Sequence, residues 1–200
     1  MTLPIVAYGD PVLRKKTEEI QPGHAGLAEL IENMFETMYN APGVGLAAPQ
    51  IGQSLRLFVV DSEQWLRENE KTQSEPAENH LTGEPIKQVF INPRMIKEYG
   101  QKWTYQEGCL SIPGIREDVQ RLDKIVIRYF DENFHEYEKE FTGITARIIQ
   151  HEYDHIEGIL FTDRISPLRR QILKNRLQAI SKGDVQVDYK MLFPARKKSR

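Results

Sequence analysis

The first regular pattern of apolar positions in the chain has the spacing of an amphipathic helix. Over residues 27–38 the apolar side chains recur at i, i+3, i+4 and i+7, and glutamates occupy positions between them. Asn40, Pro42 and Gly43 follow and are typical of a helix end. The pattern therefore predicts a helix near the N-terminus with one face turned to a core.

Strand-like segments come next. Residues 55–60 (LRLFVV) and 88–93 (QVFINP) are rich in β-branched and aromatic side chains, and the second is bounded by a proline. A stronger strand is expected over 121–131, where a turn at 131–133 leads into a partner strand that reaches Phe141. The last two segments predict a β-hairpin.

The stretch 62–87 interrupts this pattern because it is markedly polar. It is rich in Glu, Asn, Ser and Pro and poor in β-branched residues, so it can bury little apolar surface. We expect an exposed insertion or a flexible loop there.

A helix over 142–157 is the most informative element. One face of it carries Ile144, Ile148, His151 and His155, so this face begins apolar and ends in two imidazoles. The glycine that follows is placed to stop the helix.

A last helix is expected over 166–183, since a serine suited to the N-cap is followed by proline at the first helical position. Beyond it, residues 184–200 form a polar, basic tail. Together the elements predict an α+β fold, in which short antiparallel strands pack around the central helix 142–157 and one helix flanks them near each end.

Composition narrows the class of protein. The chain has 200 residues and 40% hydrophobic content, so we expect one domain over 1–200. Its 27 basic and 29 acidic side chains nearly cancel, which argues against DNA or an anionic membrane as a partner. The apolar runs are far shorter than the about 20 residues of a membrane span, and the N-terminus lacks an export signal. We therefore expect a cytoplasmic protein.

The sequence HEYDH within the 142–157 helix is an H-E-x-x-H pattern. Its spacing leaves the imidazoles of His151 and His155 about 40° apart around the helix axis and about 6 Å along it, so that one metal ion can lie between them. Glu152 points about 100° away from that face. This direction suits a group that contacts the water of a metal ion instead of the ion itself.

A catalytic metal ion needs a third protein ligand. In the zinc-protease pattern with a third histidine, that position is Phe161, which cannot bind a metal. Asp163, Asp184 and Asp188 are weak candidates downstream. The other candidate is the single cysteine, Cys109, because a thiolate is a strong ligand for borderline or soft divalent ions and its glycine neighbour lets the backbone approach closely.

A third segment, GVGLAAPQIG over 43–52, combines small residues with an amide. The small residues let the backbone pass closely against a site, and the amide of Gln50 can donate a hydrogen bond to an oxygen. An ordinary loop between a helix and a strand explains the segment equally well. No Gly-Lys-Ser/Thr ends it, so it is not a phosphate-binding loop.

Together these three segments resemble the peptide deformylase family, which is recognised by G-x-G-x-A-A-x-Q, E-G-C-x-S and Q-H-E-x-D-H in this order. Here they read GVGLAAPQ (43–50), EGCLS (107–111) and QHEYDH (150–155), without a gap in any of them. The resemblance also covers the helix before the first segment, the strands between the segments and a helix after the last. The stretch 62–87 and the region beyond Gly183 depart from it.

The resemblance implies a role for each matching residue. The implied ligands of a divalent metal ion are Cys109, His151 and His155. Glu152 would be the general acid/base, while Gln50 and the backbone N–H of Leu110 would stabilise an oxyanion. The implied native ion is Fe²⁺, one per chain, which Ni²⁺, Co²⁺ or Zn²⁺ can replace.

The implied reaction removes the formyl group from N-formyl-methionyl peptides during translation and releases formate. An apolar pocket for the methionine side chain would be formed by Val44, Gly45, Ile144 and Ile148. Arg116 lies seven residues after the cysteine and can donate to the peptide backbone.

The last predicted helix also has a local excess of basic residues, namely Arg169, Arg170, Lys174 and Arg176. In the family this helix is associated with docking near the ribosomal exit tunnel, so the resemblance implies a weak, salt-sensitive contact with ribosomal RNA. A solvated helix face explains the same residues.

Two other functions remain open from the sequence. A metallopeptidase could use the same His-Glu-His helix to cut internal peptide bonds, although the third histidine is missing. A structural metal site could tie strands to the helix, and Glu152 and Gln50 would then be replaceable.

Overall fold

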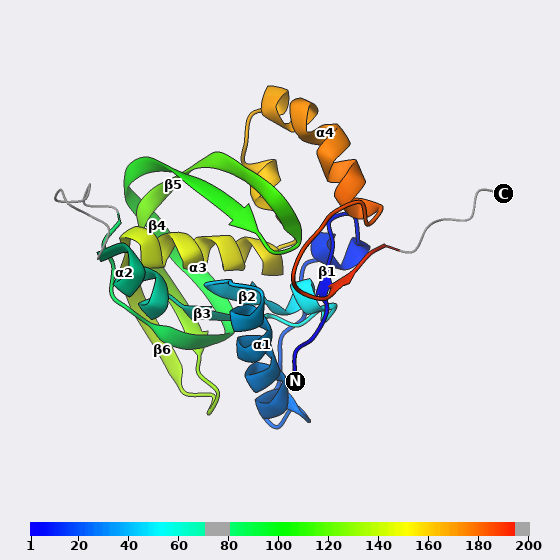
Figure 1. The fold of residues 1–200 in the computed structure, drawn as a ribbon. Coiled ribbons are helices and arrows are strands. Elements are labelled where there is room, and N and C mark those ends of the chain that lie inside the picture. The colour runs from blue at the N-terminus through cyan, green and yellow to red at the C-terminus, as the bar shows by residue number, and fades with distance from the viewer. Residues whose placement is uncertain (71–80, 195–200) are drawn as a thin grey trace.

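Five strands form one antiparallel sheet in the order β2-β3-β4-β5-β6 (Figure 1). The computed structural model describes residues 1–70 and 81–194. The strands of the sheet are β2 (Gly45–Ala47), β3 (Leu57–Asp61), β4 (Lys87–Cys109), β5 (Ile112–Phe130) and β6 (Glu136–Thr142). The helices are α1 (Leu27–Asn40), α2 (Glu63–Glu70), α3 (Gly143–Ile156) and α4 (Pro167–Ser181), with short 3₁₀ helices η1 (Pro11–Arg14), η2 (Ala48–Ile51) and η3 (Phe161–Asp163).

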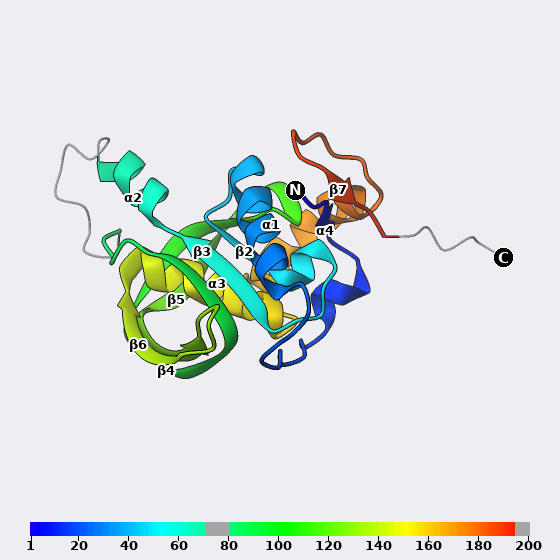
Figure 2. The same ribbon diagram turned by 90° about the horizontal axis from the view of Figure 1, so that it is seen from below.

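Helix α3 lies on the concave side of the sheet, and the long strands β4 and β5 curve around it (Figures 1 and 2). Large side chains of the strands fill the space between sheet and helix, including Phe58, Phe90, Ile125, Tyr129 and Phe141. The helix contributes Ile144, Ile148, Ile149 and Ile156 to the same core. The C-terminal half of α3, which carries His151 and His155, is therefore held in place by a well-packed apolar interface.

Strand β3 explains the continuous apolar run in the sequence, because it is covered on both faces. Phe58 and Val60 belong to the core that contains α3. Leu57 and Val59 point to the other side and pack with Met34 and other residues of α1. A strand buried on both faces has no polar side to alternate with.

The predicted end of a strand at Pro93 is wrong. Strand β4 continues through this proline for 16 further residues, to Cys109, with a break in register between Ile91 and Arg94. At the break Asn92 adopts a positive φ of 48°, and its side chain exchanges two hydrogen bonds of 2.8 Å with the backbone of Ile20. Such a bulge takes the proline out of the hydrogen-bonded ladder and lets the strand go on.

The expectation of short strands is wrong for the same part of the sheet. Strands β4 and β5 have 23 and 19 residues and are joined by the two-residue turn Leu110–Ser111. The predicted hairpin after 121–131 is confirmed, since β5 and β6 pair in antiparallel register.

The prediction of an exposed loop over 62–87 is wrong for its first part. Residues 63–70 form helix α2, in which Leu66 is buried in the main core and Trp65 packs against it. These two apolar residues, one after the other in a polar stretch, were the available signal. Residues 71–80 lie outside the described part of the chain.

Two short strands join the ends of the chain. Strand β1 (Ile5–Val6) pairs in parallel with β7 (Met191–Leu192), so the region predicted as a polar tail is structured as far as residue 194. Val185, Val187, Tyr189 and Met191 are partly buried and alternate with exposed residues, a pattern of period two that indicates an extended segment. The predicted basic end of this tail, 195–200, lies outside the described residues.

The predicted α+β fold with an antiparallel sheet is confirmed, as are the helices near the two ends. In the part of the chain that the structure describes, no helix has the length and apolar content needed to cross a membrane.

Candidate metal centre and active site

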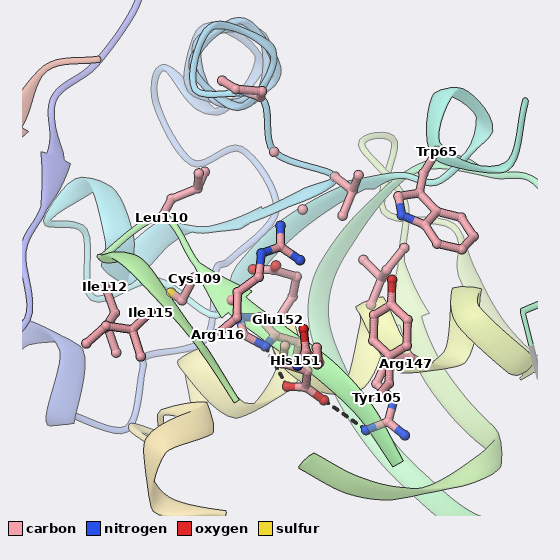
Figure 3. A pocket seen from close by; sticks show the side chains of 18 of the residues that line it. Trp65, Tyr105, Cys109, Leu110, Ile112, Ile115, Arg116, Arg147, His151 and Glu152 are labelled. Carbon is pink, nitrogen blue, oxygen red and sulfur yellow. Dashed lines mark hydrogen bonds and ion pairs between the residues drawn. The ribbon is translucent and has the colours of Figure 1, made fainter. Parts of the chain in front are cut away.

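A pocket of about 600 Å³ opens between the glycine-rich segment 43–52, the β4–β5 hairpin and α3 (Figure 3). The predicted residues Val44, Gly45, Arg116, Ile144 and Ile148 all line it. So do Cys109, Leu110, His151 and Glu152. Three segments that are far apart in the sequence thus contribute to one cavity.

Three possible metal ligands converge beside this pocket. The ligand atoms of Cys109, His151 and His155 all lie within 4.8 Å of one another, and Cys109 Sγ is 3.3 Å from His155 Nε2. Cys109 ends strand β4 and the two histidines occupy successive turns of α3. A thiolate with two imidazoles is a donor set for Zn²⁺, Fe²⁺, Co²⁺ or Ni²⁺, so these side chains fit a divalent transition metal ion.

The alternative aspartate ligands do not join this group within the described residues. Asp163, for example, faces away to η1, where Arg14 donates to its carboxylate. Of the candidates for a third ligand that the sequence left open, Cys109 is the one that lies with the two histidines in the described part of the chain.

His151 is oriented by a buried carboxylate that the sequence reasoning did not single out. Glu107 Oε2 lies 2.9 Å from His151 Nδ1, which leaves Nε2 of the same ring to face the other ligands. Arg121 donates to Glu107 through Nε at 2.7 Å and Nη2 at 2.9 Å, and Arg147 donates through Nη1 at 2.9 Å. Burial alone would raise the pKa of Glu107, but the hydrogen bonds from Arg121 and His151 outweigh it and hold that pKa well below its ordinary value.

Arg121 extends this network to the end of the helix. Its Nη1 lies 2.8 Å from Asp154 Oδ2, and Arg164 donates to the same carboxylate through Nε at 2.5 Å. Glu107, Arg121 and Asp154 are all buried. Ion pairs among these residues therefore connect β4 and β5 to α3 next to the histidines. An unpaired charge at such a buried position would destabilise the fold.

Glu152 has the features of a reactive carboxylate. It is buried, and its Oε2 has no hydrogen-bond partner among the described residues. Burial raises the pKa of Glu152 to about 7. Its position depends on a glycine, because a Cβ added to Gly45 would lie 2.5 Å from Glu152 Oε1.

Gln50 lies next to the cysteine. Its Oε1 accepts a hydrogen bond of 2.8 Å from the backbone N–H of Ala47, which turns Nε2 towards the ligand group. Nε2 is 3.4 Å from Cys109 Sγ and 3.5 Å from Ser111 Oγ. Gln50 lies in the 3₁₀ helix η2, so this part of the glycine-rich segment is regular structure and not the ordinary loop that the sequence left open.

One wall of the pocket comes from residues that the sequence reasoning missed. Trp65 of α2 and Tyr105 of β4 both line the pocket (Figure 3). The pocket is therefore partly closed by the polar stretch that was expected to stay outside the fold.

The fold and the site define a class of protein: an α+β chain with a cysteine and two histidines as possible metal ligands next to a buried, unpaired glutamate, an arrangement suited to metal-assisted hydrolysis. The family model for polypeptide deformylase matches residues 2–171. The chain belongs to the peptide deformylase family.

Relatives and solved structures agree with this assignment. The chain is 51% identical to a peptide deformylase of Christiangramia forsetii over the full length of both proteins. It is 52% identical to one of Flavobacterium psychrophilum, over 99% of this chain and all of the relative. Among solved structures, a peptide deformylase of Legionella pneumophila is similar with a TM-score of 0.74 and 34% identity, covering 92% of this chain and 98% of its own. A plant peptide deformylase reaches 0.77 with 34% identity, covering 91% and 90%.

Proposed function

We propose that this chain removes the N-terminal formyl group from formyl-methionyl peptides of newly synthesised proteins and releases formate. Membership in the peptide deformylase family supports the reaction. The observation that carries it is the convergence of three possible metal ligands, the Glu152 carboxylate and the Gln50 amide beside one pocket, which Cys109, His151 and Glu152 line. We further propose that the chain acts as a single domain in the cytoplasm.

The metal ligands in this proposal are Cys109, His151 and His155. A bound divalent ion lowers the pKa of its water and so makes hydroxide available at neutral pH. The family resemblance favours Fe²⁺ as the native ion, and the thiolate and imidazole donors also accommodate Ni²⁺, Co²⁺ or Zn²⁺.

Glu152 is the general acid/base in this proposal. Its carboxylate accepts a proton from the attacking water at the free oxygen Oε2 and then delivers that proton to the leaving amine. Its burial and the close approach of Gly45 support this role, because both hold the carboxylate in one place. A fixed carboxylate needs no reorganisation when the proton moves.

Gln50 and Leu110 stabilise the negative charge that develops on the formyl oxygen. The Gln50 amide is held by Ala47 with its Nε2 beside Cys109, and Leu110 is the residue that follows this cysteine. The second donor is the backbone N–H of Leu110. Loss of one such donor costs about 10²–10³ in rate in enzymes of known mechanism.

The methionine side chain of the substrate occupies the apolar part of the pocket. Val44, Gly45, Ile144 and Ile148 line that part, and all but the first of them are buried. Arg116 is exposed on β5 at the pocket edge, where its guanidinium is available to the carbonyl groups of a bound peptide.

Formate release tests the proposal directly. Anaerobically purified protein is incubated with formyl-Met-Ala-Ser, and the metal content of the same sample is determined. Formate that rises with the bound metal supports a deformylase. Cleavage of an internal peptide bond without formate would indicate a metallopeptidase, and a metal-loaded, inert protein would indicate a structural metal site.

We also propose a weak ribosome contact through α4. Arg169 and Arg176 are partly engaged within the chain, with Glu117 and the carbonyl of Gly114, whereas Lys174 is exposed. Because such a contact is electrostatic, co-sedimentation with ribosomes should fall as salt rises and should weaken in Lys174→Glu. The matched control is Lys139→Glu on β6; equal binding of both variants would contradict the proposal.

A further inference from the structure

The turn between β4 and β5 is held at both of its carbonyl groups by the two ends of the chain. The carbonyl of Ser111 accepts a hydrogen bond of 2.9 Å from the backbone N–H of Tyr8. The carbonyl of Leu110 accepts one of 2.8 Å from the hydroxyl of Tyr189. This turn directly follows Cys109, so both bonds act on the segment that carries the proposed ligand and the proposed backbone donor.

The terminal segments also hold each other. We call residues 184–194 the C-terminal strap; Figure 1 shows it in red beside β1. The N–H of Ile5 donates to the carbonyl of Lys190 at 2.8 Å, and that of Ala7 donates to the carbonyl of Leu192 at 2.7 Å. Tyr189 is the residue immediately before this pairing, so its hydroxyl is presented from an anchored backbone.

The side chain of Tyr189 is positioned by packing as well. It lies half-buried against the core that contains α1 and the partly buried Leu110. Burial raises the pKa of Tyr189 to about 12, so the hydroxyl keeps its proton at physiological pH and stays a donor. Buried tyrosine hydroxyls usually find one polar partner, and here that partner is the carbonyl of the turn.

The strap lies beyond the part of the chain that the family model describes. That match ends at residue 171, and the strap begins 13 positions later. The match to the family model therefore does not include Tyr189, and its contact is read from the tertiary structure of this chain.

We propose that Tyr189 is a positioning residue for deformylation, acting through the peptide backbone of Leu110. This inference rests on the proposed function, because it requires that the Leu110 N–H donates a hydrogen bond to the oxyanion. The N–H and the carbonyl of Leu110 are joined through one Cα, and each belongs to a rigid peptide plane. Only the φ and ψ of Leu110 separate the two planes, so a carbonyl held by Tyr189 leaves fewer orientations open to the N–H.

The size of the expected effect follows from how donors act in catalysis. Complete loss of an oxyanion donor costs about 10²–10³ in rate. A donor that is still present but less well directed loses part of this, so we expect kcat of Tyr189→Phe to fall about 3- to 30-fold. The KM for the peptide should stay within about twofold, because the strap contributes no residue to the lining of the pocket.

The experiment compares wild type, Tyr189→Phe and Tyr137→Phe as purified, metal-loaded full chains. Active sites are titrated with a tight-binding hydroxamate, and kcat for formate release is expressed per titrated site. Tyr137 is the matched control, since its hydroxyl also donates to a protein acceptor, Asp131, but none of the residues that line the pocket lies on β6. Its kcat per site should equal that of wild type.

The outcomes separate a positioning role from a structural one. A lower kcat per site with an unchanged number of titrated sites supports the proposal. Fewer titrated sites with an unchanged kcat per site would mean that the hydroxyl only stabilises the fold, and this overturns it. Equal losses in both variants, or no loss in Tyr189→Phe, overturn it as well. Absence of formate release from wild type would instead contradict the proposed function.

Discussion

Gly45 and Glu152 approach each other so closely that the glycine cannot acquire a side chain without moving the carboxylate. A Cβ on Gly45 would lie 2.5 Å from Oε1 and 2.7 Å from Cγ of Glu152. Real Cβ atoms essentially never come this close to another heavy atom. The glycine-rich segment and the helix α3 are thus matched in shape at the residue proposed to move the proton.

Gly45→Ala should therefore lower kcat strongly while leaving the metal ligands in place. We expect a loss of about 10²-fold, because a displacement of about 1 Å at a reacting group has this order of effect. The measurement is formate release together with metal content. A variant with nearly wild-type kcat would contradict the assigned role of the contact, and loss of metal would mean that the substitution disturbs more than Glu152.

Glu152→Gln tests the carboxylate itself, because it keeps the size of the side chain and removes its basicity. General acid/base groups contribute about 10²–10⁴ in rate, so we expect kcat to fall by at least about 10²-fold with the metal retained. Asp118→Asn, which removes one exposed carboxylate of β5, is the control and should remain active. Activity above about one tenth of wild type in Glu152→Gln would rule out this role.

Glu107→Gln should weaken metal binding, because the N–H at His151 Nδ1 then donates to a neutral amide oxygen instead of a carboxylate. Loss of such a partner typically costs about 10- to 100-fold in metal affinity. Competition for Zn²⁺ with a chromophoric chelator measures it. Glu117→Gln is the matched control, since this buried glutamate is the cross-strand neighbour of Glu107 but accepts its hydrogen bonds from Arg169 instead of from a histidine. Unchanged affinity in Glu107→Gln would show that His151 needs no such orientation.

Trp65→Ala should broaden the range of side chains accepted at the first position of the substrate. The indole closes the pocket next to Tyr105, so its removal makes room for a larger group. We expect the preference for formyl-Met over formyl-Phe peptides, measured as the ratio of kcat/KM values, to fall by up to about tenfold. A ratio that does not change would place Trp65 outside the part of the pocket that the side chain reaches.

Asp163 links stability to pH. Burial would raise its pKa, but hydrogen bonds from Arg14 and from the N–H of Leu160 outweigh this and hold the pKa below its ordinary value of 3.8. A carboxyl with a depressed pKa in the folded state contributes stability above its unfolded pKa and loses it as the pH falls through the folded pKa.

Asp163→Asn should therefore lower the free energy of unfolding by about 1 kcal/mol at pH 7, a modest value because the side chain is 29% exposed. The difference from wild type should shrink as the pH falls below 3.8. Urea unfolding of wild type and Asp163→Asn, at pH 7 and at a pH below 3.8, measures this difference. A difference that is the same at both would contradict the assignment.

Much of the fold follows from local sequence patterns. The period of apolar residues predicts α1 and α3, and the Ser-Pro pair predicts the start of α4, because these signals act within one or two turns of a helix. The pairing of β5 and β6 follows from a turn signal between two strand-like runs. Predictions failed where distant residues decide the local conformation, as at Asn92, whose bulge depends on hydrogen bonds to Ile20.

The sequence by itself determined the inventory of the site: a cysteine, an H-E-x-x-H helix and a glycine-rich segment with a glutamine, each recognisable from residue type and spacing. Only the tertiary structure decided what surrounds them. Glu107 and Tyr189 meet the site from 44 and 79 positions away in the chain, counted to His151 and Leu110. No periodicity encodes contacts of this kind, because they depend on how the hairpin, the helix and the chain ends pack against one another in space.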